Sequence, residues 1–211
     1  EVFCAVVPGR NSFCLADNIL THNCGFVSSE HLDDDVGTPF GWAMHMLMLG
    51  VGVGFDTRGA DTVTIKGFDD SLPVTRHVIA DSREGWTESL MRLLRHGTHG
   101  KSRITFDYSE IRPAGEPIKG FGGTASGPAP LKKLHNRVEE VIDTCDGTFD
   151  ARDITDIMNM IGACVVAGNV RRSAELALGN KDNEQYLDLK NYDKNPERGQ
   201  WGWTMPKNLA A

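Results

Sequence analysis

The sequence predicts a protein of the α/β class, because segments with helical hydrophobic spacing alternate along the chain with short segments typical of strands. The 211 residues are 40% hydrophobic and 24% charged, which is typical of globular proteins, and the length fits one domain or two small ones. No run of about 18 apolar residues is present, so we expect no membrane span. Periodicity alone leaves a barrel and a wound sheet as alternatives.

The first half of the chain is expected to begin with two short strands within residues 1–23, joined by a loop with a turn at Pro8-Gly9. The apolar residues of 40–47 have helical spacing and predict a helix that ends before Gly50. The alternating glycines from Gly50 to Gly54 lack the spacing of a phosphate-binding loop. We interpret them as tightly packed backbone in a strand or bend.

The second half of the chain continues the alternation of predicted helices and strands. Asp81 and Ser82 are placed to cap a helix that ends at Gly97, and Glu84 resembles the second residue of a capping box. The same patterns predict a strand at 104–111, a loop rich in Gly and Pro at 115–130, helices at 131–144 and 153–166, and a strand at 170–178.

Charge and cysteine usage narrow the class of function. The net charge of −7 and the pI near 5.5 argue against binding of nucleic acid or of an anionic membrane, because such surfaces are usually basic. Five cysteines without close pairing, and no secretory signal, predict a cytoplasmic protein with reduced thiols. The run Asp33-Asp34-Asp35 is interpreted as a solvated loop rather than a cation site, because three adjacent side chains rarely converge on one ion.

Residues 18–24 carry a definite chemistry. The side-chain amide of Asn23 can attack its own backbone carbonyl and break the next peptide bond, while His22 protonates the departing amine. The thiol of Cys24 can accept an acyl chain as a thioester. A cyclising amide, a proton donor and a thiol thus occupy three consecutive positions.

Together with VVPGRNSF (6–13), this segment resembles the two C-terminal sequence blocks of inteins, over Glu1–Cys24. The resemblance implies that Asn23 cyclises, that His22 assists and that Cys24 is the first residue of the following extein. Asn11 stands where inteins often have His, and the cysteine and histidine of an N-terminal intein half are absent. An ordinary β-hairpin before a cysteine is the alternative.

From Cys24 to Trp203 the chain resembles the adenosylcobalamin-dependent ribonucleoside-triphosphate reductases, the class II ribonucleotide reductases. Any one matching stretch is suggestive only, and their shared order and spacing make the resemblance specific. The stretches are CGFVSSE (24–30), MLGVGVGFD (48–56), DSREGW (81–86), IRPAGEPIKGFGGTASGP (111–128), AGNVRRSAE (167–175) and WGW (201–203).

This resemblance implies a ten-stranded α/β barrel, about half of it in this chain, with an intein segment at 1–23, a barrel fragment at 24–203 and a divergent tail at 204–211. It implies reduction of ribonucleoside triphosphates to deoxyribonucleotides by radical chemistry, in DNA precursor synthesis. Adenosylcobalamin is implied by the resemblance alone, since no cobalt-ligating motif is found and no other metal site is expected. The other implied partners are a deoxynucleotide effector and a thioredoxin-type reductant.

Cys24 is the central residue of the resemblance. In the resembled family, the cysteine at this position is half of a thiol pair that supplies two electrons to the ribose and ends as a disulfide. Cys24 would therefore act first as the splicing nucleophile and afterwards as a reductant. Cys145, at a helix end, and Cys164, on an apolar helical stretch, are interpreted as packing residues.

Two basic loops resemble the effector-binding loops of reductases. Residues 111–120, with Arg112 and Lys119, correspond to the first loop. Residues 168–172, with Arg171, correspond to the second, which relays the identity of the effector to substrate choice. Arginine suits this role because its guanidinium holds phosphate oxygens bidentately. An ordinary surface position is the alternative for each arginine.

The cysteine that carries the thiyl radical in the resembled family, with its neighbouring Asn and Glu and the partner of Cys24, is expected further along the sequence than this chain extends. The reductase would therefore need a downstream segment, and the splicing end would need an N-terminal intein half. Two other functions remain open from the sequence. The chain could be a split-intein fragment whose only chemistry is splicing, or a non-catalytic remnant that binds nucleotides.

Overall fold

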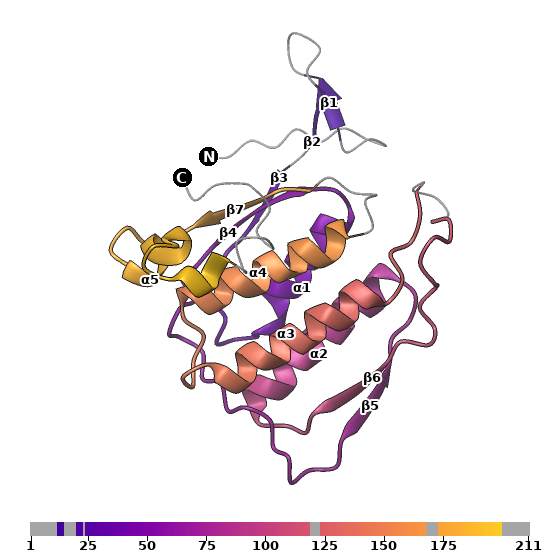
Figure 1. Ribbon diagram of the computed structural model, residues 1–211, viewed down its shortest axis with the longest axis horizontal. Helices are drawn as coiled ribbons and strands as arrows, with labels where there is room; N and C mark the ends of the chain where they lie inside the picture. The colour runs from indigo at the N-terminus through magenta and orange to yellow at the C-terminus, as the bar shows by residue number, and fades with distance from the viewer. Residues whose placement is uncertain (1–11, 15–19, 23, 119–122, 168–172, 200–211) are drawn as a thin grey trace.

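The structure is a computed structural model that describes residues 12–14, 20–22, 24–118, 123–167 and 173–199. Its strands form three small sheets (Figure 1), which confirms the α/β prediction, and the described residues do not form a closed ten-stranded barrel. The sheets are the antiparallel pair β1 (Ser12–Cys14) and β2 (Leu20–His22), the parallel sheet of β3 (Cys24–Val27), β4 (Gly52–Asp56) and β7 (Glu175–Leu178), and the parallel pair β5 (Thr75–Val78) and β6 (Ile104–Asp107).

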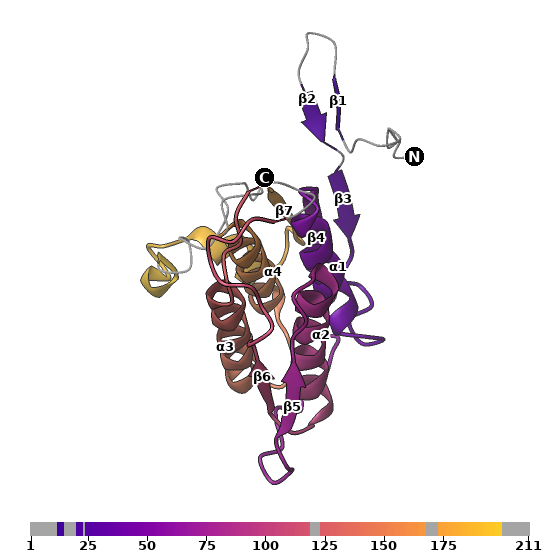
Figure 2. The same cartoon turned by 90° about the vertical axis from the view of Figure 1, so that its right-hand side faces the viewer.

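Four long helices separate the two parallel sheets (Figures 1 and 2). They pack in a ring in which each helix contacts two others. The first and fourth cover one face of the β3-β4-β7 sheet, and the β5–β6 pair packs against the second and third. The helices are α1 (Gly37–Met48), α2 (Arg83–His99), α3 (Ala129–Thr144) and α4 (Ala151–Val166), and α5 (Glu184–Leu187), η2 (Asp188–Lys190) and η3 (Pro196–Gly199) follow β7.

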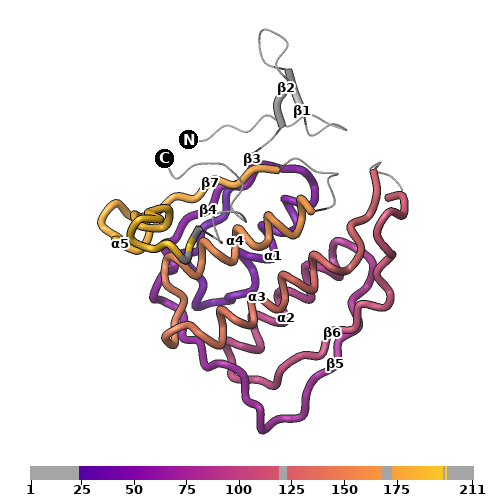
Figure 3. The backbone as a smooth tube through the Cα atoms, viewed as in Figure 1, coloured from indigo at the N-terminus to yellow at the C-terminus, as the bar shows by residue number. Residues whose placement is uncertain are grey.

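One hydrophobic core joins these layers. Phe40 of α1, Phe55 of β4, Leu93 of α2 and Ile154 of α4 are fully buried in it. The tube in Figure 3 shows how the chain reaches this arrangement: it leaves the three-stranded sheet after β4, builds the β5–α2–β6–α3 segment and returns through α4 to β7. The three-stranded sheet is therefore assembled from segments far apart in the sequence.

Helix α2 starts after one of the two predicted capping residues, whereas its end differs from the prediction. Ser82, not Asp81, is the N-cap, and its hydroxyl accepts a hydrogen bond from the backbone N–H of Gly85. The helix continues through Gly97 and ends at Gly100, whose φ of 66° is the left-handed conformation typical of a helix end. A Cβ on Gly97 would lie 2.6 Å from a side-chain carbon of Ile142. Gly97 therefore permits close packing of α2 on α3.

Several other elements differ from the prediction in extent. Gly52 and Gly54 of the glycine run lie in a strand, β4, as interpreted, whereas Gly50 lies in the turn before it with a φ of 81°. Helix α4 begins two residues before the predicted start because Asp150 caps it, in a capping box with Asp153. The described strands β6 and β7 are shorter than predicted, and β5 was not predicted at all. The predicted helix end at Gly168-Asn169 lies outside the described residues.

The acidic run at 33–35 is fixed at its end by an arginine of α2. Both carboxylate oxygens of Asp35 accept hydrogen bonds from Arg95, at 2.9 and 2.6 Å, and this contact holds the pKa of Asp35 well below its usual range. No group of three or more His, Cys, Asp or Glu side chains in the described part of the chain could hold a metal ion. No described helix is long and apolar enough to cross a membrane.

A buried histidine ties α2, α3 and β6 together. The hydroxyl of Ser89 donates to the carbonyl oxygen of Trp86, so Nε2 of His135 is the donor in its 3.0 Å contact with Ser89. Nδ1 of His135 then accepts from the hydroxyl of Tyr108, at 2.8 Å. Burial lowers the pKa of His135 to about 3, so the imidazole is neutral near neutral pH.

We predict that His135 makes the fold acid-sensitive. Its folded pKa lies below the unfolded value of 6.5, so the stabilisation is complete above pH 6.5 and is lost as the pH falls toward about 3. The expected slope is up to about 1.4 kcal/mol per pH unit. His135→Gln keeps a donor and an acceptor but cannot be protonated, and should flatten this slope. Urea unfolding at several pH values measures it, and equal slopes for both proteins would contradict the assignment.

An ion pair anchors the segment after β7 to α4. Asp156 of α4 and Arg198 of η3 are both buried, and the guanidinium donates to both carboxylate oxygens at 3.0 and 2.7 Å. Nε of Arg198 also donates to the carbonyl oxygen of Leu189. Burial raises the pKa of Asp156, and the contact with Arg198 opposes that shift. The contact with Arg198 therefore favours the charged form of the carboxylate.

Candidate functional site

Cys24 lies on the face of the three-stranded sheet that no described helix covers, and this face is called the uncovered face below. It is the first residue of β3, its side chain is exposed, and it pairs in register with Gly52 of β4. A Cβ on the next residue, Gly25, would meet the ring of Trp42 from α1, so residue 25 faces the helices. Because side chains alternate along a strand, Cys24 faces the opposite way. Gly52 has no side chain beside the thiol, which stays open to another molecule or segment.

The predicted splicing residues immediately precede this strand. His22 is the last residue of β2, and Asn23 and Asn11 lie outside the described residues. In Figure 2 the β1–β2 pair stands clear of the helices, beyond the start of β3. A hairpin is therefore present directly before Cys24, which agrees with the intein interpretation and equally with an ordinary hairpin.

Cys145 and Cys164 are less reactive than an exposed thiol. Cys164 is buried in α4, and burial raises its pKa to about 12. Cys145 is half-buried at the end of α3, and burial raises its pKa as well. A thiolate is the reactive form, so these shifts oppose reaction at both residues. Their placement agrees with the packing role predicted for them.

Arg112 lines a cavity of about 240 Å³ between the start of α2, the end of α4 and the segments 111–118 and 123–127, which an isolated bridge between Pro117 and Thr124 joins. Its Nε donates to the carboxylate of Asp81 at 2.6 Å, and Nη1 lies 3.4 Å from the carbonyl oxygen of Pro117. The guanidinium of Arg112 is thus held in place by Asp81, a residue that the sequence predicted to be a helix cap. Lys119 and Arg171 lie outside the described residues, so only one of the three predicted effector residues is placed.

A second cavity, of about 340 Å³, adjoins the first. Lys133 and Arg137 of α3 line it, its described lining residues include no acid, and it shares Ser126 and Cys164 with the cavity of Arg112. It reaches Ala167, directly before the second predicted effector loop. The sequence analysis did not single out these two cations, although their spacing of four residues on a helix indicates one face.

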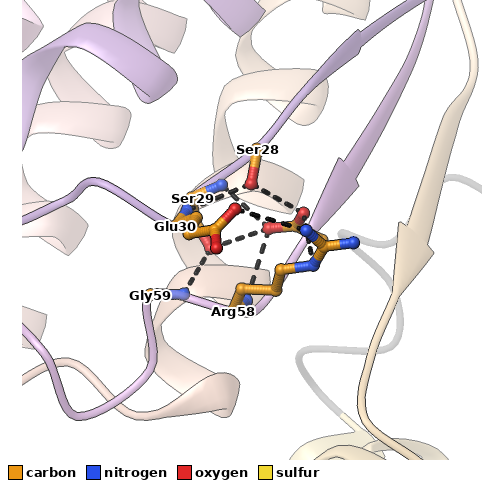
Figure 4. Close-up of polar contacts among 6 residues, drawn as sticks. Ser28, Ser29, Glu30, Arg58 and Gly59 are labelled. Carbon is orange, nitrogen blue, oxygen red and sulfur yellow. Dashed lines mark hydrogen bonds and ion pairs between the residues drawn. The ribbon is translucent and has the colours of Figure 1, made fainter.

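Asp56, at the end of β4, organises the carboxyl ends of β3 and β4 (Figure 4). Its buried carboxylate accepts hydrogen bonds from the backbone N–H of Ser29 and from the hydroxyls of Ser28 and Ser29, at 2.8 to 3.0 Å. Arg58 contacts the same carboxylate through its backbone N–H and its guanidinium, which also reaches Glu30. A carboxylate with this many donors holds the two strand ends in a fixed geometry.

Comparison with known proteins shows the class of enzyme that the chain resembles. A family described as "B12-dependent ribonucleotide reductase, insertion domain" matches residues 58–142, which begin just after β4 and include β5, α2, β6 and most of α3. The crystal structure of a B-12 dependent (class II) ribonucleotide reductase superposes with a TM-score of 0.67 and 28% identity, over 83% of this chain and 31% of that chain. The fold is therefore that of a part of a class II ribonucleotide reductase.

Curated relatives give the family. The chain is 47% identical to the adenosylcobalamin-dependent ribonucleoside-triphosphate reductase of Euglena gracilis, over 97% of this chain and 29% of the relative. It is 42% identical to the probable enzyme of that name from Dictyostelium discoideum, over 90% of this chain and 27% of the relative. The enzyme of that name from Lactobacillus leichmannii is 35% identical, over 74% of this chain and 26% of the relative.

The chain belongs, as a partial chain, to the adenosylcobalamin-dependent ribonucleoside-triphosphate reductase family. It spans less than a third of the length of the curated relatives that it matches. The alignment with the Euglena protein leaves out only 3% of this chain, so it includes most of the residues before Cys24.

Proposed function

We propose that the chain is a segment of a ribonucleoside-triphosphate reductase and that Cys24 is one of its redox-active thiols. The observation that carries this proposal is the exposed Cys24 thiol on the uncovered face of the parallel sheet, beside Gly52. Replacement of the ribose hydroxyl by hydrogen, with release of water, consumes two electrons and two protons. Two thiols supply them and end as a disulfide.

The partner of Cys24 in this reaction is a thiol from a part of the full-length protein that this chain does not span. Cys145 and Cys164 do not fit the role, because burial raises the pKa of each thiol. A thioredoxin-type protein would then reduce the disulfide by thiol exchange. The direct test is turnover of ribonucleoside triphosphates by an enzyme assembled from this chain and the missing segments. No deoxynucleotide product from a correctly assembled enzyme would overturn the proposal.

Adenosylcobalamin is proposed as the cofactor of that full-length enzyme because the relatives are named as dependent on it. When bound, it would supply the radical that starts the reaction. The described residues contain no cluster of ligating side chains for a metal, and we assign none of them to the cobalamin. The contribution of this chain is the reducing thiol and its surroundings.

The two adjoining cavities are proposed as the site of a deoxynucleoside triphosphate effector. The cavity of Arg112 is mostly apolar with one ion pair, which suits a base and sugar. The second cavity is lined by Lys133 and Arg137, whose positive charges suit phosphates. Both cavities border the loops predicted from sequence to bind the effector, and Lys119 and Arg171 are proposed to join them there.

Charge removal in these cavities should weaken effector binding. In the assembled enzyme, Arg112→Ala or Lys133→Ala should cost about 1.5–3 kcal/mol, or about 10- to 150-fold in affinity, and leave unstimulated turnover nearly intact. Arg171→Ala should instead change which base is preferred. Lys132→Ala, an exposed lysine outside both cavities, is the matched control. Equal effector affinity in the control, Arg112→Ala and Lys133→Ala would remove these cavities from the site.

A second proposed activity is protein splicing at the bond between Asn23 and Cys24. The short β1–β2 pair, which ends one residue before that bond, favours it. With a matching N-terminal intein half, the chain should give a product ligated at Cys24, with Asn23 cyclising and His22 assisting. The inclusion of most of these residues in the Euglena alignment favours the alternative, an ordinary hairpin of the reductase.

The splicing prediction concerns Asn23→Ala. This variant cannot close a succinimide, so release of residues 1–23 should stop while the unaltered chain is cleaved before Cys24. Mass spectrometry of both proteins after addition of the N-terminal half measures the release. Equal cleavage in both, or none in either, would reject the splicing activity without affecting the reductase proposal.

A further inference from the structure

One tyrosine of the chain donates its hydroxyl hydrogen to a base. Of the three tyrosines, all within the described residues, only Tyr108 has a hydroxyl that contacts a side chain able to take up a proton. Its partner is Nδ1 of His135, at 2.8 Å. The hydroxyl of Tyr186 donates instead to the carbonyl oxygen of Ala177, which is not a base at neutral pH. Tyr108 and His135 are not among the described residues that line the effector cavities.

The imidazole of His135 is held in the orientation that can accept this proton. Its Nε2 donates to Ser89, whose own hydroxyl hydrogen goes to the carbonyl oxygen of Trp86, so Nδ1 carries the lone pair. The ring of Phe106 stacks on the imidazole, with the two ring centroids 4.1 Å apart. His135 is only 1% exposed, so a proton that reaches Nδ1 is shielded from water.

This hydrogen bond prepares Tyr108 for one-electron oxidation. Removal of an electron from a phenol turns its hydroxyl into a strong acid. At Tyr108 the proton can cross the 2.8 Å hydrogen bond to Nδ1 as the electron leaves, and the products are a neutral tyrosyl radical and an imidazolium. A tyrosine without a base must release its proton to solvent or remain a radical cation of high energy. The base therefore makes Tyr108 the most easily oxidised of the tyrosines.

Burial favours return of the proton after the oxidation. Burial, with a smaller effect of the neighbouring His77, lowers the pKa of His135 to about 3, so the imidazolium persists only while the phenol is a radical. Burial and the nearby Glu139 raise the pKa of Tyr108, so the phenol holds its proton at neutral pH before oxidation and takes it back after reduction. The proton thus stays within the pair.

From this geometry we propose that Tyr108 and His135 form a site of reversible one-electron oxidation that intercepts oxidising radicals. A peroxyl radical takes the electron and becomes a peroxide anion, which water protonates, while the phenolic proton moves to His135. A one-electron reductant such as ascorbate later returns the electron, and the proton returns to the phenol. In Figures 1 and 2, β6, which Tyr108 follows, lies at the other end of the molecule from β3. The site is therefore separate from Cys24 and its proposed chemistry.

The test is photochemical oxidation of the chain by tris(bipyridine)ruthenium(III), followed by electron paramagnetic resonance and transient absorption. The tyrosyl radical should form on Tyr108, so Tyr108→Phe should remove most of the signal. Tyr186→Phe is the matched control, because this hydroxyl donates only to a carbonyl oxygen, and it should leave the signal unchanged. A second flash after addition of ascorbate should reproduce the first signal. A full signal in Tyr108→Phe, or none after the second flash, would overturn the inference.

A further measurement isolates the proton transfer. Because the proton goes to a buried base, the rate of Tyr108 oxidation in the unaltered chain should not depend on buffer concentration. His135→Gln keeps a hydrogen-bond acceptor but no base, and should slow the oxidation about 100-fold. Circular dichroism checks that each variant is folded, and the buffer dependence of the unaltered chain decides the question if His135→Gln is not. A rate that rises with buffer concentration, or an equal rate in a folded His135→Gln chain, would contradict the proposal without affecting the thiol or effector proposals.

Discussion

A full-length enzyme with Cys24→Ser is expected to lose multiple turnover with a thioredoxin-type reductant. Serine keeps a hydroxyl of similar size but cannot form a disulfide or give up electrons as a thiol does. Radical formation does not use Cys24 in the proposed mechanism and should persist. The substrate radical would then form without its reductant, so loss of base and degradation of the ribose are expected in place of deoxynucleotide.

The measurements are product analysis over many cycles and rapid kinetics of radical formation. Cys145→Ser is the matched control, because this half-buried thiol has a pKa raised by burial and no proposed redox role. It should turn over normally. A normal yield of deoxynucleotide from the Cys24→Ser enzyme would exclude Cys24 from the thiol pair, and loss of turnover in both variants would point to a general effect on folding.

Removal of the buried guanidinium of Arg198 should strongly destabilise the chain. Arg198→Met leaves the buried Asp156 without its partner, and breaking a buried ion pair in this way costs about 3–5 kcal/mol. Because burial already raises the pKa of Asp156, the variant should recover stability at low pH, where the carboxyl is protonated. Chemical denaturation at pH 7 and at pH 4 measures both effects.

Two further variants test the cause. Lys194→Met breaks the nearby exposed pair with Asp188 and should leave stability unchanged. Asp156→Leu combined with Arg198→Met replaces the pair by apolar side chains and should restore most of the lost stability. If the double variant is as unstable as Arg198→Met alone, lost packing of the arginine, and not the uncompensated charge, is responsible.

Helices were predictable from this sequence because their signals are local. The spacing of Phe40 to Leu47 and the cap before α2 lie within a few residues of the elements they define. Gly97 was wrongly predicted to end the helix. A glycine is needed there because Ile142 of α3 packs against it, and no local sequence pattern shows that contact. Strand β5 has four residues, too few for a clear alternation. The pairing of β4 with β7 joins residues more than a hundred positions apart.

The same distinction applies to the candidate sites. Cys24 stood out because its motif is contiguous, and the structure adds the face on which the thiol lies. Arg112 was predicted, but its ion pair with Asp81 joins two segments whose proximity depends on the fold. Lys133 and Arg137 border a cavity only because α4 packs beside them. Charged residues that belong to no sequence motif can be assigned to a site only when the tertiary packing around them is known.

The contact of Tyr186 with β7 has a consequence for how the sheet could grow. The carbonyls of Ala174 and Leu178 accept from Val53 of β4 and from Thr57 directly after it. The carbonyl of Ala177 therefore points to the outer edge, where it accepts a hydrogen bond from the hydroxyl of Tyr186. A strand from another molecule that paired along the whole of β7 would have to displace this ring. Tyr186 thus protects an open edge against unintended association, and any neighbouring strand of a completed enzyme must either stop short of Ala177 or move the tyrosine aside.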